Sequence, residues 1–238
     1  MKQYKKDSSY SYSLGIYTTI ELLSKRPNQV KNVFIHSEYK GVERLQILCD
    51  KNSIEIKQDD KLFNRLSQKE NNYVLGVFSK YACKLSGAKP HVVLVNPSDM
   101  GNLGTIIRTL AGVNITNLAI ITPAADYWNP KTIRASMGAL FHLNIESFSS
   151  FIEYRKCYDS HSIYPFMLDG EVVLNLENCP RKEKYSLVFG NEASGLTENF
   201  RNEGLSVQLP QSGITDSYNL AVSTGIGAFI FAKTNGQI

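Results

Sequence analysis

The sequence predicts an α/β protein whose larger part is built on a parallel sheet. Short, continuous apolar runs, the form of a strand buried on both faces, occur at residues 91–95, 118–121, 163–167, 185–189 and 205–209. Helical spacing of apolar residues occurs between or after them, at 103–111, 130–140, 151–158 and 219–233. Strands that alternate with helices imply right-handed crossovers, so ligand sites are expected at the carboxyl ends of the strands.

A smaller α/β domain is expected before this part. Residues 1–15 are rich in Lys, Ser and Tyr and predict an arm or a frayed start. Helices are then expected at 14–26, 42–49 and 62–66, and strands at 30–36, 53–56 and 73–78. Residues 79–90 are the predicted linker, which gives domains at 1–85 and 90–238.

Composition limits the class of protein. The chain has 238 residues, 42% hydrophobic and 20% charged, which is sufficient for a substantial core. A net charge of +4 permits a polyanionic partner without requiring one. The sequence contains no apolar run long enough to cross a bilayer and no signal peptide, so a cytoplasmic protein with no membrane partner is expected. The four cysteines and four histidines lack metal-site spacing, and free thiols and no metal are expected.

The first candidate loop, residues 96–104, follows an apolar run and leads into a helix that carries Arg108. It has neither the Gly-Lys-Ser/Thr ending of a phosphate-binding loop nor a GxGxxG fingerprint, which disfavours nucleoside triphosphatases and ordinary dinucleotide-binding enzymes. Arg108 stands in an apolar stretch and needs a carboxylate or a phosphate as partner. A structural salt bridge and a functional role both remain open for it.

Two further polar loops follow apolar runs, at 190–196 and 210–219. Glycines at 190 and 195 allow a ligand to approach the backbone. Taken separately, these loops have ordinary interpretations: Glu192 as the cap of the next helix, and Ser217 as an N-cap. Together, three such loops indicate a binding site.

The ordered motifs in these loops resemble those of the SpoU (TrmH) branch of the SPOUT superfamily. The first motif is Asn102-Leu-Gly-Thr-Ile-Ile-Arg108-Thr, and the second is Gly190-Asn-Glu192 followed by Gly-Leu. The third is Pro-Gln-Ser-Gly followed by Ser-Tyr-Asn219-Leu. Residues 134–142 also resemble a stretch of the family, and the resemblance extends from about residue 92 to 233.

The resemblance implies an RNA ribose 2′-O-methyltransferase that uses S-adenosyl-L-methionine (AdoMet), needs no metal, forms a homodimer and has a carboxy-terminal trefoil knot. Arg108 would act as the base or stabilise the developing alkoxide, and Asn102, Glu192 and Asn219 would arrange the reacting groups. The implied cofactor-binding residues are Leu187, Phe189, Gly190, Leu209, Pro210, Gly213, Ile214, Ser217 and Leu220.

The amino-terminal region resembles the small ribosomal-protein-like RNA-binding domain of many family members, chiefly at residues 15–23. Ribosomal RNA is therefore the expected substrate; tRNA, or a non-catalytic RNA-binding role, is the alternative. Three departures from the family pattern are expected to alter the nucleotide or cofactor pocket. They are two additional residues in the loop before Asn102, Gln211 in place of methionine, and Tyr218 in place of leucine.

Overall fold

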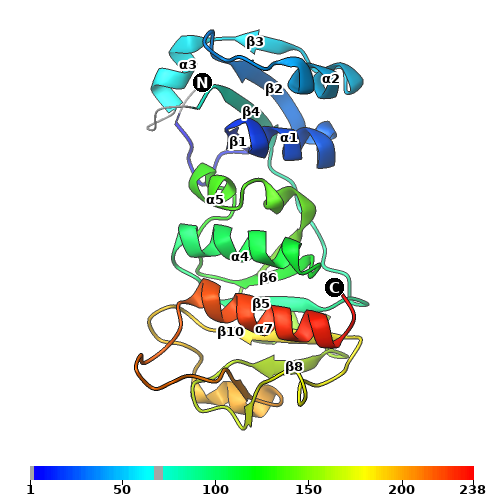
Figure 1. Cartoon of the computed structure of the whole chain (residues 1–238), viewed down its shortest axis with the longest axis vertical. Coiled ribbons are helices and arrows are strands. Elements are labelled where there is room, and N and C mark those ends of the chain that lie inside the picture. The colour runs from blue at the N-terminus through cyan, green and yellow to red at the C-terminus, as the bar shows by residue number, and fades with distance from the viewer. Residues whose placement is uncertain (1–2, 67–71) are drawn as a thin grey trace. The chain divides into compact units, whose positions relative to one another are not determined.

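The computed structural model describes residues 3–66 and 72–238, and these form two compact units (Figure 1). The first unit contains the chain up to Tyr81 together with Asp126–His142, and the second contains Ala82–Ala125 and Leu143–Ile238. The expected boundary near residues 85–90 is thus close to the observed one at residue 81. The division differs in the segment 126–142, which was expected with the carboxy-terminal domain and packs with the amino-terminal unit.

The first unit is built on a four-stranded sheet with the order β1-β4-β2-β3. Strand β4 is antiparallel to both β1 and β2, and β3 is parallel to β2. Its elements are β1 (Tyr10–Leu14), α1 (Ile16–Lys25), η1 (Pro27–Gln29), β2 (Val30–Ile35), α2 (Glu43–Lys51), β3 (Ile56–Gln58), α3 (Asp60–Leu66) and β4 (Val74–Ser79). The expected helices and strands of this region are confirmed, although β3 begins where the expected strand ends.

Residues 10–14 form strand β1, so the expectation of an amino-terminal arm or frayed start was wrong for these residues. Residues 1 and 2 of the expected arm lie outside the described chain. Tyr12 is 2% exposed, and Ser11 and Ser13 are fully buried. The hydroxyl of Ser13 accepts a hydrogen bond from the N–H of Gly76 at 3.1 Å and lies 3.0 Å from the hydroxyl of Thr19. Because buried serines replace apolar residues here, the sequence lacks the alternation that marks a strand.

Residues 126–142 belong to the first unit because their aromatic side chains pack in its core. The ring of Trp128 lies 5.8 Å from that of Phe78 and 4.8 Å from that of Tyr81. The expected helix at 130–140 is instead α5 (Pro130–Ala135) followed by the 3₁₀ turn η2 (Ala139–His142). Met137 and Gly138 have φ angles of 53° and 85°, and this left-handed backbone ends the α-helix.

The second unit contains a five-stranded, fully parallel sheet with the order β7-β6-β5-β10-β8. Its elements are β5 (His91–Val95), α4 (Met100–Gly112), β6 (Asn117–Ile121), β7 (Asn144–Phe148), α6 (Phe151–Cys157), β8 (Ser162–Pro165), β9 (Val172–Val173), β10 (Tyr185–Phe189), η3 (Glu198–Glu203), β11 (Val207–Gln208) and α7 (Leu220–Thr234). The sequence did not predict β7 and β9. The strand expected at 205–209 is shorter and pairs with β9 outside the main sheet.

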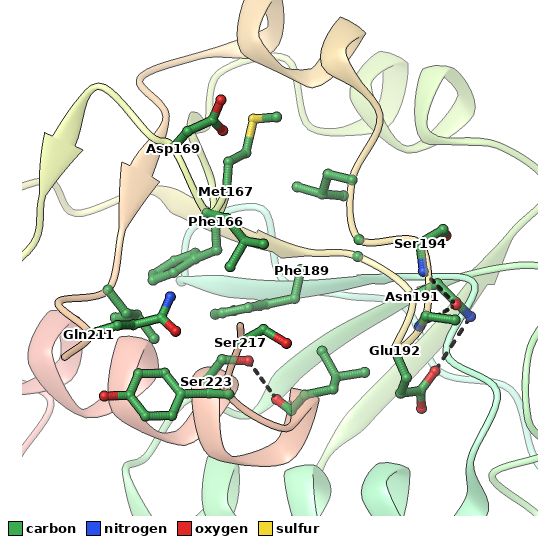
Figure 2. A pocket seen from close by; sticks show the side chains of 18 of the residues that line it. Phe166, Met167, Asp169, Phe189, Asn191, Glu192, Ser194, Gln211, Ser217 and Ser223 are labelled. Atoms are coloured by element: carbon green, nitrogen blue, oxygen red, sulfur yellow. Dashed lines mark hydrogen bonds between the residues drawn. The ribbon is translucent and has the colours of Figure 1, made fainter. Parts of the chain in front are cut away.

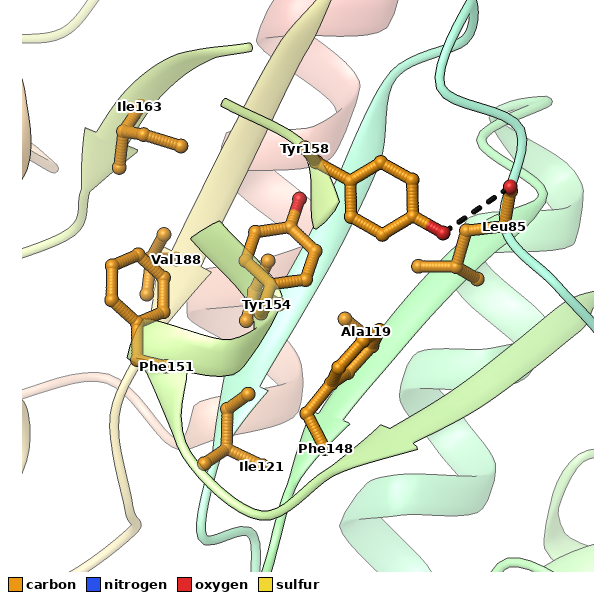
Figure 3. Close-up of a cluster of buried hydrophobic side chains, with 10 residues drawn as sticks. Leu85, Ala119, Ile121, Phe148, Phe151, Tyr154, Tyr158, Ile163 and Val188 are labelled. Atoms are coloured by element: carbon orange, nitrogen blue, oxygen red, sulfur yellow. Dashed lines mark hydrogen bonds between the residues drawn. The ribbon is translucent and has the colours of Figure 1, made fainter. Parts of the chain in front are cut away.

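Both faces of this sheet are covered. Helices α4 and α7 lie side by side on one face (Figure 1). On the other face α6 covers a cluster of buried apolar side chains, in which Phe151 and Tyr154 pack over Val188 and Ile121 (Figure 3). This double burial explains why β5 and β10 are continuous apolar runs. In the described part of the chain, no helix combines the length and apolarity needed to cross a bilayer.

Candidate active site

The polar loops meet at the point where the strand order reverses. Strands β6 and β7 follow β5 on one side of the sheet, and β10 and β8 lie on its other side. The loops at 96–99 and 190–195 leave the adjacent carboxyl ends of β5 and β10. A crevice at such a switch point is the usual ligand site of an open parallel sheet.

Glu192 joins these two loops. One carboxylate oxygen accepts hydrogen bonds from the backbone N–H and the hydroxyl of Ser98, at 3.0 and 2.8 Å. The other accepts from the N–H of Asp99 at 3.0 Å and from the side-chain amide of Asn102 at 3.4 Å. Burial alone would raise the pKa of Glu192, but the N–H groups of Ser98, Asp99 and Glu192 itself and the Ser98 hydroxyl lower it to about 2. Glu192 is therefore an ionised structural carboxylate at neutral pH, and it cannot serve as a proton donor there.

Asn102 continues this line of hydrogen bonds to the third motif. Its side-chain oxygen accepts from the amide of Asn219 at 3.1 Å. The oxygen of Asn219 in turn accepts from the N–H of Ala221 at 2.8 Å, so Asn219 is the N-cap of α7. The structure thus brings together three of the four expected catalytic residues, and it assigns the cap to Asn219 rather than Ser217.

Arg108 stands apart from this network. It lies on α4, two turns beyond the helix start, and its side chain is exposed. Among the described residues it has no hydrogen bond or ion pair, so Arg108 forms no structural salt bridge in this part of the chain. It is also not among the residues that line the pocket described next.

A pocket of about 330 Å³ opens beside the loop at 190–195 (Figure 2). Its apolar wall includes the rings of Phe166 and Phe189, which stack with centroids 4.2 Å apart. Gly227 of α7 permits this stack, since a Cβ there would lie 2.6 Å from the Phe166 ring. Gly190 is equally constrained, because its Cβ would meet the backbone of Gly195 at 2.1 Å. Both glycines therefore shape the pocket by omitting a side chain.

The pocket contains only part of the expected cofactor-binding set. Phe189, Gly190, Leu209, Ser217 and Leu220 line it. Leu187, Pro210, Gly213 and Ile214 do not line it. Leu187 is fully buried in β10, whereas Ile214 is 89% exposed on the loop before α7. The sequence pattern identified loops that contribute to the pocket, but it could not distinguish which of their side chains turn inward.

One wall of the pocket was not predicted from the sequence. Phe166, Met167, Leu168 and Asp169 follow β8 and line this wall. Their position after an expected strand at 163–167 was a usable signal, since that end of a parallel strand is where ligands bind. Gln211 and Tyr218, the two departures from the family pattern, also line the pocket.

Carboxylates dominate the charge at the pocket. Asp169, Glu192 and Glu198 all line it. Arg201 of η3 forms ion pairs with Asp169 and, through Nε, with Glu198 at 2.7 Å. The pair with Asp169 joins η3 to the segment that follows β8. Three carboxylates against one paired guanidinium favour a ligand that carries positive charge.

The fold and site define an α/β protein with a small-molecule pocket at the switch point of a parallel sheet. A network of hydrogen-bonded polar side chains lies beside the pocket. The model of the SpoU rRNA Methylase family matches residues 89–229. The chain belongs to this family, which confirms the resemblance drawn from the three motifs.

Comparison with individual proteins gives the same relationship. The chain is 27% identical over 146 residues to the 23S rRNA (guanosine(2553)-2′-O)-methyltransferase RlmP of Bacillus subtilis, covering 60% of this chain and 58% of that relative. It thus spans somewhat over half the length of RlmP. A protein of Borreliella burgdorferi described as an uncharacterised tRNA/rRNA methyltransferase is 23% identical over 217 residues, or 88% of this chain and 86% of the relative.

Solved structures share the fold over nearly the whole chain. The AdoMet-bound rRNA methyltransferase of Sinorhizobium meliloti superposes with a TM-score of 0.79 at 23% identity, covering 94% of this chain and 87% of the other. The SpoU methyltransferase AviRb of Streptomyces viridochromogenes, also solved with AdoMet, has a TM-score of 0.80 at 18% identity and covers 94% and 90%. At these identities the likeness establishes the α/β fold.

Proposed function

We propose that this protein transfers a methyl group from AdoMet to a ribose 2′-hydroxyl of structured RNA, and that the RNA is ribosomal. The observation that carries this proposal is the hydrogen-bonded line from Glu192 through Asn102 to Asn219 beside the pocket. It joins one residue from each of the three family motifs at the switch point. RlmP, a relative of the chain, is named as a 23S rRNA 2′-O-methyltransferase.

The pocket suits AdoMet in size, polarity and charge. Its volume of about 330 Å³ falls within the range of small-molecule sites. Phe166, Phe189 and Leu209 offer an apolar wall to a purine base, and the carboxylates of Asp169 and Glu198 stand at the rim, where a cationic ligand gains from them. AdoMet supplies an electrophilic methyl group bonded to a sulfonium, so no metal is needed for activation.

The polar network would position the reacting groups. Glu192 fixes the loop at 96–99, and Asn102 and Asn219 hold the starts of α4 and α7 together. A ribose hydroxyl is a weak nucleophile at neutral pH and must lose its proton during attack. We assign Arg108 to this step: its guanidinium would stabilise the negative charge that develops on the 2′-oxygen, and it would accept the hydroxyl proton only after losing one of its own to solvent.

The separation of Arg108 from its own pocket supports a homodimer. Helix α7 exposes Val222 and Phe229, both 48% exposed, on the unit where α4 carries Arg108. Exposed apolar side chains on a helix favour a subunit interface. A second copy packed on this face would bring Arg108 to the pocket of its neighbour, so that each active site would use residues of both chains.

Close backbone contacts between segments distant in the chain support the trefoil knot. The N–H of Met167 donates to the carbonyl of Val207 at 2.9 Å. A Cβ at Gly204 would lie 2.1 Å from the carbonyl oxygen of Ile163, and one at Gly170 would lie 2.4 Å from the backbone of Val207. The segment at 204–208 therefore runs parallel to, and in close contact with, the segment at 163–170, the kind of tight packing expected around a knot.

The first unit is proposed to bind the RNA substrate. Its sheet and helices form a compact unit with its own core, and Lys5, Lys6 and Lys80 lie near its amino-terminal strand. The positively charged side chains of these lysines would attract RNA phosphates, and exposed aromatic rings can stack on unpaired bases. A protein that acts on ribosomal RNA would reside in the cytoplasm.

Methyl transfer tests the proposal directly. Labelled AdoMet is incubated with unmodified ribosomal and transfer RNA, and the RNA is digested to nucleosides. We expect label in a 2′-O-methylnucleoside of ribosomal RNA, and loss of this label with Arg108→Ala. Label only in tRNA would change the substrate class. Binding of AdoMet with no transfer to either pool or to assembling ribosomal particles would favour a non-catalytic RNA-binding protein.

Complementation tests the shared site. Arg108→Ala and Asn102→Ala are each expected to be inactive, and mixing and reassociating the two should restore about a quarter of the activity in random dimers, because half the dimers are mixed and each has one intact site. Sedimentation should show a dimer, and Phe229→Asp should convert it to a monomer. A monomeric, active wild-type protein would disprove the shared site.

A further inference from the structure

Gln211 carries an unpaired amide in the pocket. It follows β11 and lines the pocket, and its Oε1 is buried without a hydrogen-bond partner. No hydrogen bond joins either end of this amide to another residue in the ranges 3–66 and 72–238. A buried polar group without a partner destabilises the folded protein. Such a group at a pocket wall is explained if a ligand supplies the partner.

The surroundings of Gln211 indicate what kind of ligand group this is. Its amide points toward the rings of Phe166 and Phe189 (Figure 2). The Glu192 end of the pocket, which borders the polar network, lies away from these rings in the same view. A flat aromatic group is therefore favoured beside Phe166 and Phe189, and Gln211 would meet its polar edge.

We propose that the side-chain amide of Gln211 recognises the adenine base of AdoMet. This inference rests on the proposed function, which supplies the identity of the ligand. The adenine edge presents an amine donor next to a ring-nitrogen acceptor, and the amide presents an acceptor and a donor in one plane. The 6-amino group donates to Oε1, and Nε2 donates to the ring nitrogen. Glutamine pairs with adenine in this two-bond manner elsewhere.

Tyr218 positions Gln211 for this contact. Its hydroxyl donates to the carbonyl of Pro210 at 3.1 Å, which ties the far end of the loop to the residue before Gln211. Tyr218 also lines the pocket. The two side chains that depart from the family pattern thus act at one end of the pocket, and Tyr218 is a positioning residue for the amide.

The proposed pairing of Gln211 with adenine is tested by removing the 6-amino group from the ligand and, separately, the amide from residue 211. Calorimetry compares S-adenosylhomocysteine with the analogue in which purine replaces adenine, so that only the 6-amino group is lost. We expect the wild-type protein to prefer the adenine ligand about tenfold, the value of one hydrogen bond. Gln211→Met should reduce this preference to near unity. Tyr218→Phe should reduce it partly, an effect that loss of stability alone would not produce.

Two variants serve as controls. Gln208→Met makes the same change three residues earlier, on a side chain that does not line the pocket, and should keep the tenfold preference. Gln211→Glu keeps an acceptor for the amine but opposes the ring nitrogen, so it should keep the preference while binding both ligands more weakly. If Gln211→Met does not fold, the adenine preference and the weaker binding of Gln211→Glu test the role of Gln211 instead.

The outcomes distinguish a failure of the Gln211 proposal from a failure of the proposed AdoMet-dependent function. A tenfold preference that survives in Gln211→Met, or no preference in the wild-type protein, overturns the role of Gln211 and leaves AdoMet binding intact. Failure of S-adenosylhomocysteine to bind the wild-type protein overturns the cofactor assignment and this inference together.

Discussion

Glu192 binds Ser98 on the opposite side of the switch point. A single carboxylate oxygen of Glu192 accepts hydrogen bonds from both the backbone N–H and the hydroxyl of Ser98, at 3.0 and 2.8 Å. This contact joins the loop after β10 to the loop after β5. The start of α4 is thereby fixed next to the pocket, because Asp99, the N-cap of that helix, also donates its N–H to Glu192.

Replacing Glu192 by glutamine should weaken this junction. The amide has one acceptor oxygen instead of two, and its NH₂ would oppose backbone N–H groups. We expect a loss of about 2 kcal/mol in the free energy of unfolding, measured by urea denaturation. Because the pKa of Glu192 lies near 2 and its ordinary value is 4.5, the wild-type protein should lose this advantage as the pH falls below 4.5. An unchanged difference between the two proteins at pH 3.5 and pH 7 would contradict this assignment.

Asn219 has two separable tasks. Its oxygen caps α7, and its NH₂ holds Asn102. Asn219→Asp keeps the capping oxygen and loses the donor, so the melting temperature should stay near that of the wild-type protein while methyl transfer falls at least tenfold. Asn219→Ala should lose the cap too, at about 1 kcal/mol. If Asn219→Asp retained full activity, the contact with Asn102 would have no role in the reaction.

Gly190→Ala should damage the pocket at its base. The added Cβ would lie 2.1 Å from the backbone of Gly195, and backbone cannot rotate away as a flexible side chain can. We expect at least 2 kcal/mol of destabilisation and no detectable binding of S-adenosylhomocysteine by calorimetry. Gly112→Ala is the matched control: nothing lies within 4 Å of its Cβ, and it should be neutral or slightly stabilising. Tight binding by Gly190→Ala would refute the requirement for a close approach of Gly190 to Gly195.

A buried histidine should make the second unit sensitive to acid. Burial lowers the pKa of His91 from 6.5 to about 4, and its Nδ1 lies 2.9 Å from the hydroxyl of Tyr154. The ring of His161, whose pKa burial also lowers, lies 4.3 Å away, and the charge of Glu146 acts in the opposite sense.

Since the folded state binds fewer protons than the unfolded state between pH 6.5 and pH 4, stability should fall as the pH is lowered through this window. Each such group contributes up to about 1.4 kcal/mol per pH unit. Urea titrations at several pH values measure this slope, and His91→Gln should flatten it. An identical slope in the variant would assign the acid sensitivity to other groups.

Much of the second unit was predictable because a parallel sheet covered on both faces needs continuous apolar strands. His91–Val95 and Tyr185–Phe189 are such runs and were located to the residue. Strand β7, Asn144–Phe148, was missed because it is an edge strand that carries Asn144, Glu146 and Ser147. Its place in the sheet comes from pairing with β6, which the local sequence does not show.

The order and spacing of the motifs identified the family and placed Asn102, Glu192 and Asn219 in three loops, since polar residues directly after apolar strands are typical of a binding loop. Which of the side chains in these loops meet depends on how the chain folds. The tertiary structure placed Gln211 at the pocket wall and Ile214 in solvent, it left Arg108 apart from the other three catalytic candidates, and it moved residues 126–142 into the amino-terminal unit. These outcomes depend on packing between segments distant in the chain, such as the close contact of Gly204 with Ile163, for which periodicity and motif spacing carry no signal.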